Sequence, residues 1–160
     1  MRIVLQRVTG AAVTINGAET RRIGAGLAAL VGFCHGDGEE EAAYLAAKMI
    51  GLRIFDDDGG NLNLSLPDVG GQCLIVPNFT LYANSRKGRR PSFTASMAPG
   101  QASALFDYFV ETVKSGGVAV QCGLFGADML VDIHNDGPVT IILDSAEIMP
   151  KQAPQYYDGS

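Results

Sequence analysis

The most constraining feature of the sequence is a continuous run of small and apolar residues from Gly26 to Phe33. A run without polar alternation is typical of a strand that is buried on both faces. The longest uncharged apolar stretch, from Ile23 to Cys34, is too short for a membrane-spanning helix, which needs roughly 20 residues. We therefore expect a fully buried central strand, closed by the turn-forming segment 35–38.

Two further segments carry the apolar spacing of helices. Residues 39–50 begin with three glutamates, which suit a helix N-terminus, and Gly51 provides a stop. The second helix is expected from Pro99-Gly100 to about Ser115. Short strands are expected within 3–15, with turns at Thr9-Gly10 and Asn16-Gly17, and then at 52–55, 72–76, 118–122, 129–134 and 139–143, the last two joined by a tight turn at 135–138.

These elements predict one mixed α/β domain over residues 1–150, with two main helices on one side of a largely antiparallel sheet. The chain has 160 residues, which is the length of one ordinary domain. Residues 151–160 lack a core pattern, so we expect a loosely ordered C-terminal tail.

Charge and cysteine content narrow the class of protein. The net charge of −5 argues against a general nucleic-acid coat. The three cysteines are far apart and form no C-x-x-C pair, so we interpret them as reduced core residues of a cytoplasmic protein. The run Asp56–Asp58 lacks the spacing of a calcium loop and is expected at a hairpin tip. We expect no metal and no cofactor.

No familiar set of catalytic side chains is present. His35 and His134 are the only neutral-pH bases, and both are explained as structural residues. The corner at 77–80 ends a buried strand with free N–H groups that could hold a carbonyl oxygen, although strands end in many places without function. Gly137-Pro138 lacks one side chain and one N–H and permits a cis bond. The residues alone do not decide whether either feature, the corner or the Gly137-Pro138 pair, belongs to a functional site.

One basic segment also stands out. It contains a third of the basic residues of the chain and precedes Pro91, so it could hold phosphates in an extended conformation. The alternative is a solvated loop that discourages aggregation. The segment consists of Arg86, Lys87, Arg89 and Arg90.

The ordered set of motifs resembles the D-tyrosyl-tRNA deacylase family of D-aminoacyl-tRNA deacylases, over residues 1–149. The matching segments are Gln6-Arg7-Val8, Leu52–Phe55, Asn63–Leu66, Phe79–Ala83, Lys87–Phe93, Phe125–Met129 and Asn135–Thr140. The resemblance implies a homodimeric cytoplasmic hydrolase that cleaves the ester between a D-amino acid and the terminal adenosine of tRNA, and that accepts glycine mischarged on tRNA. Its implied partners are aminoacylated tRNA and a second copy, with no DNA or membrane.

The resemblance also implies site residues. Gly137 and Pro138 would form a cis pair that enters the partner's pocket and excludes L side chains, with Arg7 holding the pair. The implied catalytic corner is Thr80, Phe79 and Asn78, whose main-chain N–H groups would bind the carbonyl oxygen. The remaining implied residues are Asn135, Phe125 and Met129 for substrate binding, and Arg86, Lys87, Arg89 and Arg90 for tRNA phosphates.

The chain departs from the family at Pro77-Asn78, where Ser-Gln is usual. Because Phe79 is kept, we expect D-selectivity to be retained. No base lies near Thr80 in the sequence, so we expect the ribose 2′-hydroxyl of the substrate to assist the attacking water. Two other interpretations of the function remain open: a non-catalytic tRNA-binding module that uses the basic segment, and an oligomeric scaffold without tRNA affinity.

Overall fold

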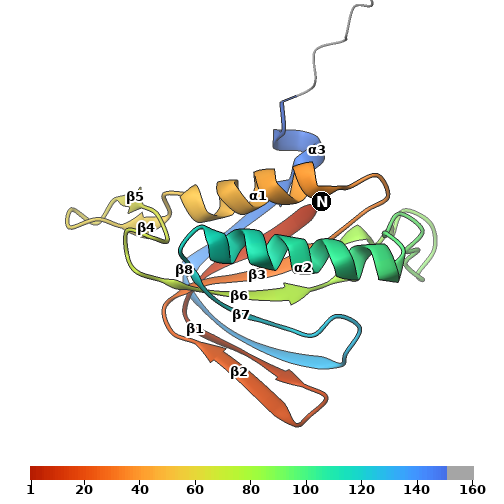
Figure 1. Ribbon diagram of the computed structural model, residues 1–160, viewed down its shortest axis with the longest axis horizontal. Coiled ribbons are helices and arrows are strands. Elements are labelled where there is room, and N and C mark those ends of the chain that lie inside the picture. Colours follow the sequence, from red (N-terminus) through yellow and green to blue (C-terminus); the bar gives the residue numbers. More distant parts are fainter. Residues whose placement is uncertain (151–160) are drawn as a thin grey trace, which may run out of the picture.

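The computed structural model describes residues 1–150 (Figure 1). The tail expected at 151–160 lies outside the described residues. The elements in chain order are β1 Arg2–Ile15, β2 Glu19–Ile23, β3 Gly26–Gly32, α1 Glu39–Gly51, β4 Phe55–Asp56, β5 Leu62–Leu64, β6 Gln72–Pro77, the 3₁₀ helix η1 Phe79–Tyr82, α2 Pro99–Ser115, β7 Ala119–Cys122, β8 Met129–Asp144 and α3 Ser145–Ile148.

Strand β3 is the central strand, as its apolar run predicts. It pairs antiparallel with β1 and parallel with β6, which in turn pairs parallel with β7. Helices α1 and α2 both lie on one face of the sheet (Figure 1). Leu27, Ala29 and Val31 belong to the apolar cluster that includes the helices, whereas Ala28 belongs to a second cluster on the other face. The mixed α/β fold is therefore confirmed, with parallel and antiparallel pairs in one sheet.

Strand β1 is continuous over 14 residues, so the predicted turn at Thr9-Gly10 is wrong. The pairing of β1 with β8 shifts register on both sides of Val8, which bends the strand instead of reversing it. The first half of β1 pairs with β3 and the second half with β2. The predicted turn at Asn16-Gly17 is confirmed: both residues have positive φ, 50° and 67°, as a two-residue hairpin turn requires.

Strand β8 is also one continuous element, so the predicted pair of strands joined by a tight turn at 135–138 is wrong. Both halves of β8 pair antiparallel with β1. Asn135 lies opposite Val8 and Thr140 lies opposite Gln6, which leaves residues 136–139 as a bulge opposite Arg7. Glycine and proline indicate a change of chain direction, and the alternation on either side does not distinguish a hairpin from a bulge within one strand.

The acidic run lies at the tip of the β4–β5 hairpin, as predicted. The Asp57 carboxylate accepts hydrogen bonds from the main-chain N–H groups of Gly59 and Asn61, and these bonds lower the pKa of Asp57 below its usual value. The three cysteines are free, and burial raises the pKa of Cys73 to about 12. In the described part of the chain, no helix has the length and apolar character needed to cross a membrane.

Candidate active site

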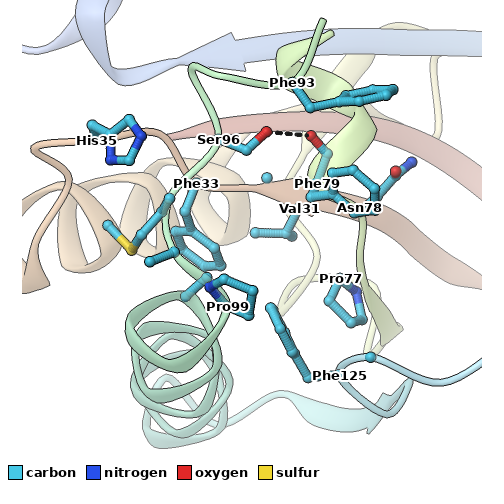
Figure 2. Close-up of a pocket in the computed structure, with 15 residues that line it drawn as sticks. Val31, Phe33, His35, Pro77, Asn78, Phe79, Phe93, Ser96, Pro99 and Phe125 are labelled. Atoms are coloured by element: carbon cyan, nitrogen blue, oxygen red, sulfur yellow. Dashed lines mark hydrogen bonds between the residues drawn. The ribbon is translucent and has the colours of Figure 1, made fainter.

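A cavity of about 450 Å³ opens where β3 and β6 end and α2 begins. Figure 2 shows that its lining converges from several segments: Val31 and Phe33 at the end of β3, Pro77 and Asn78 at the end of β6, Pro99 at the start of α2, and Phe125 before β8. Most of these side chains are apolar, so the cavity can enclose an uncharged organic group and exclude water from it.

The corner between β6 and η1 forms one wall of the cavity. Asn78 donates its main-chain N–H to Val31 O at 2.7 Å, which ties the corner to the end of β3. Gly32 permits this close approach, because a Cβ at that position would lie 2.9 Å from Asn78 O. The chain therefore needs glycine at the end of its central strand to bring η1 against the cavity.

The N–H groups of this corner are not equally available. The Asn78 side-chain oxygen accepts from the Thr80 N–H at 3.2 Å and also from the Thr80 hydroxyl. The Leu81 N–H donates to Asn78 O at 3.4 Å. The Phe79 N–H has no acceptor within residues 1–150. Phe79 lines the cavity, so its N–H is the donor that remains for a ligand oxygen.

An exposed aromatic pair stands at the mouth of the cavity. Phe79 is 57% exposed and Phe93 38% exposed, and their rings meet edge to face with centroids 5.2 Å apart. The Ser96 hydroxyl donates to Phe79 O at 3.2 Å, which fixes the segment opposite η1 (Figure 2). Exposed rings of this kind offer faces on which a nucleobase can stack.

Several cavity residues were not predicted from the sequence. Phe33, Met97, Pro99 and Ala102 form the apolar wall opposite the corner. From the sequence, each would be assigned to the core, because apolar spacing does not distinguish a filled core from the wall of a cavity. The one signal in the sequence was that the second helix is expected to begin at Pro99, soon after the corner and the basic segment along the chain.

Phe125 lies in the cavity wall, where it also contacts Phe106 with ring centroids 6.4 Å apart. Met129 does not line the cavity. Its sulfur lies against Gly123, and its side chain packs on the second apolar cluster, on the face of the sheet opposite the helices. The structure therefore brings Phe125 into the cavity beside the corner, whereas Met129 lies outside the cavity.

The bulge in β8 holds Gly137 and Pro138, and the bond between them is cis. Arg7, only 8% exposed, donates from Nε to Asp136 O and from Nη1 to Ile54 O, each at 3.0 Å. The Asn135 side-chain oxygen accepts from the Val139 N–H at 2.9 Å, which closes the base of the bulge. A buried guanidinium and an amide thus fix the position of the Gly137-Pro138 backbone.

Within one chain, the bulge and the corner are separate. Neither Gly137 nor Pro138 lines the cavity, and both are exposed. The two halves of the predicted site therefore do not meet inside a single copy.

The basic segment forms an exposed loop directly after η1. Asn84 and Ser92 pair across its base, with N–O distances of 2.8 and 2.9 Å. The four cations make no ion pair with the rest of residues 1–150, so all of them are available to an anionic ligand: Arg86, Lys87, Arg89 and Arg90. The described residues contain no cluster of three His, Cys, Asp or Glu side chains suited to a metal ion.

The chain is similar to known proteins in both sequence and structure. The model of a family described as D-Tyr-tRNA(Tyr) deacylase matches residues 4–144. A D-aminoacyl-tRNA deacylase of Bacillus velezensis is 52% identical over 147 residues, which cover 92% of this chain and all of that protein. A D-aminoacyl-tRNA deacylase of Thermomicrobium roseum is 53% identical over 148 residues, 92% of this chain and 96% of that protein.

A solved structure titled "c-Myc DNA Unwinding Element Binding Protein" has a TM-score of 0.84 and 37% sequence identity, covering 91% of this chain and 99% of that one. These likenesses define the class of protein as a hydrolase that acts on ester bonds. The chain belongs to the D-Tyr-tRNA(Tyr) deacylase family, which confirms the resemblance seen in its motifs.

Proposed function

We propose that this protein hydrolyses the ester bond of D-aminoacyl-tRNA to free D-amino acid and tRNA, and that it also accepts glycine mischarged on tRNA. The observation that carries the proposal is the similarity to D-aminoacyl-tRNA deacylases at about half identity over nine-tenths of the chain. The cavity beside an unpaired main-chain donor and an exposed basic loop supports it. The aromatic pair at the cavity mouth suits the terminal adenosine.

The chemistry we infer relies on geometry rather than on a side-chain base. The substrate's carbonyl oxygen accepts from the Phe79 N–H, which stabilises the negative charge that develops there by roughly 3 kcal/mol. A water oxygen bonds to the carbonyl carbon and loses one proton, which the neighbouring 2′-hydroxyl relays to the ribose oxygen as the bond between that oxygen and the carbonyl carbon breaks. The Thr80 hydroxyl donates to the Asn78 amide oxygen, which cannot take up its proton, so Thr80 supports the corner without attacking the ester.

Chiral selection, in this proposal, requires a second copy of the chain. The Gly137-Pro138 bulge of one copy covers the cavity of the other and leaves no room for an L side chain beside the α-carbon. A D side chain points away from this wall, and glycine has no side chain to exclude. The exposed position of the bulge supports this arrangement, as do two exposed apolar side chains on β8, Leu130 at 67% and Ile142 at 63%, which a second copy would cover.

The departure at Pro77-Asn78 is compatible with this chemistry. Pro77 stands at the last paired position of β6, where a missing N–H costs little. The shorter Asn78 side chain reaches both the N–H and the hydroxyl of Thr80, and so caps η1. We therefore expect the change to leave the Phe79 donor in place.

The test of the function is deacylation of D-Tyr-tRNA, L-Tyr-tRNA and Gly-tRNA by the purified protein. We expect the D and glycyl esters to disappear at least about 100-fold faster than the L ester, because only the L side chain meets the backbone wall. Equal loss of the D and L esters would contradict chiral exclusion. Stable binding of charged tRNA with no loss of any ester would favour the non-catalytic binding module.

Thr80→Val tests the mechanism. Valine keeps the shape of threonine and replaces only the hydroxyl with a methyl group, so we expect the single-turnover rate constant for D-Tyr-tRNA to fall by less than about tenfold. The measurement is single-turnover deacylation, with circular dichroism as the control for folding. A loss of about 1,000-fold or more in a folded variant would show that Thr80 is the nucleophile.

A further inference from the structure

A second cavity of about 440 Å³ lies at the other end of η1. Its lining comes from two parts of the chain that are far apart in sequence, the first residue of β1 and the segment that follows η1. The fold thereby adds a basic side chain from the N-terminal strand to the start of the basic loop. The residues that line it are Arg2, Tyr82, Ala83, Asn84, Ser85 and Arg86.

Arg2 is held rigidly at this cavity. Its Nε and Nη2 contact Asp144 Oδ2 at 2.9 and 2.7 Å, and its Nη1 donates to Leu81 O at 2.8 Å. Its guanidinium also stacks over the Tyr82 ring, 4.8 Å from the centroid. A guanidinium has five N–H groups, so two remain for a ligand in a fixed orientation. An oxyanion that binds there would meet a donor that has already lost its rotamer freedom.

The other lining groups also suit an anion. Arg2 and Arg86 are the only charged side chains that line the cavity, and both are cationic. Burial and a hydrogen bond with Cys34 raise the pKa of Tyr82, so its phenol adds no negative charge at neutral pH. The Asn84 side chain accepts from the Arg86 N–H at 3.0 Å, which turns the chain so that Ser85 and Arg86 flank the cavity.

We propose that this cavity binds one phosphodiester group of the single-stranded 3′ end of tRNA, with Arg2 and Arg86 on either side of it. The inference rests on the proposed function and extends it by one contact. η1 separates this cavity from the Phe79 donor by three residues, or about 6 Å at the rise of a 3₁₀ helix. A phosphate held at one end of η1 would therefore set the position of the ester at the other end, as phosphate contacts do in nucleic-acid complexes.

The test compares D-Tyr-tRNA with D-tyrosyl-adenosine, which has the ester but no phosphate. Arg86→Gln removes an exposed charge, and Arg2→Lys keeps a charge but removes the guanidinium fork. For each variant we expect KM for D-Tyr-tRNA to rise about 5- to 10-fold, while KM for D-tyrosyl-adenosine changes less than about twofold. The salt dependence of kcat/KM for D-Tyr-tRNA should weaken by about 0.7 in log–log slope for Arg86→Gln. Arg22→Gln, an exposed arginine on β2, is the matched control and should leave both substrates unaffected.

Equal losses on the two substrates would show that Arg2 and Arg86 act only on folding or on the ester site, and would overturn the proposal. An unchanged KM for D-Tyr-tRNA in both variants would overturn it as well. Binding of the trinucleotide CpCpA tests the site without catalysis, so it still applies if the protein hydrolyses no ester. We expect Arg86→Gln to weaken that binding about 5- to 10-fold. Inorganic phosphate that binds at this cavity as tightly as CpCpA would assign the site to free phosphate instead.

Discussion

Gly137→Ala is expected to lower kcat/KM for D-Tyr-tRNA by about 100-fold, the cost of moving a site wall by about 1 Å. Gly137 has a φ of 138°, a backbone conformation that residues other than glycine rarely adopt. An added Cβ would lie 2.8 Å from Val139 Cγ2 and 2.9 Å from Val139 N, so the bulge must shift. Because Arg7 and Asn135 hold the two sides of the bulge, we expect the backbone of the Gly137-Pro138 pair, which would face the substrate, to move.

The matched control is Gly70→Ala. Gly70 also has a positive φ, 61°, but a Cβ there would meet nothing within 4 Å. The control separates the strain of a positive φ from the displacement of the bulge, so we expect it to keep wild-type activity within about threefold, with a stability cost of about 1 kcal/mol. If Gly137→Ala is as active as Gly70→Ala, the bulge does not form a wall of the active site.

Phe79→Pro is the second change with a large expected effect, because it deletes the one main-chain donor proposed for the carbonyl oxygen. We expect kcat for D-Tyr-tRNA to fall about 100- to 1,000-fold relative to Phe79→Ala. The backbone accommodates proline at this position: Phe79 is the first residue of η1, and Asn78 before it is extended, with φ −147° and ψ 92°. The measurement is single-turnover deacylation of D-Tyr-tRNA.

Phe79→Ala is the reference for this comparison, since it loses the ring and its contact with Phe93 but keeps the N–H. Circular dichroism and thermal unfolding of both variants check that η1 and the β6 corner remain folded. Equal kcat for the proline and alanine variants would mean that another group stabilises the developing charge.

The central strand and both long helices could be predicted from sequence because each depends on local periodicity. Burial on both faces gives β3 its unbroken apolar run, and the apolar stripes of α1 and α2 face the sheet. The ends of the helices also followed from local chemistry, with glutamates in the first turn of α1 and proline at the start of α2.

The long strands β1 and β8 could not be predicted in this way, because their continuity depends on pairing between distant residues. Turn-forming residues occur at Thr9-Gly10 and Gly137-Pro138. The chain pairs with its neighbouring strand on both sides of each position, so the strand continues and the irregularity becomes a bend or a bulge. The corner at Asn78–Thr80 was located from the sequence. Which of its N–H groups is unpaired depends on the contacts of the Asn78 side chain, and these form only in the folded chain.

We propose that one active site combines the corner of one copy with the bulge of another. The direct measurement is deacylation of D-Tyr-tRNA by Gly137→Ala and Phe79→Pro protomers that are co-expressed and purified as a mixture. Random pairing makes half of the dimers mixed, and in each mixed dimer one of the two sites has both halves intact, so we expect about a quarter of wild-type activity. Activity no greater than the average of the two variants measured separately would contradict a shared site.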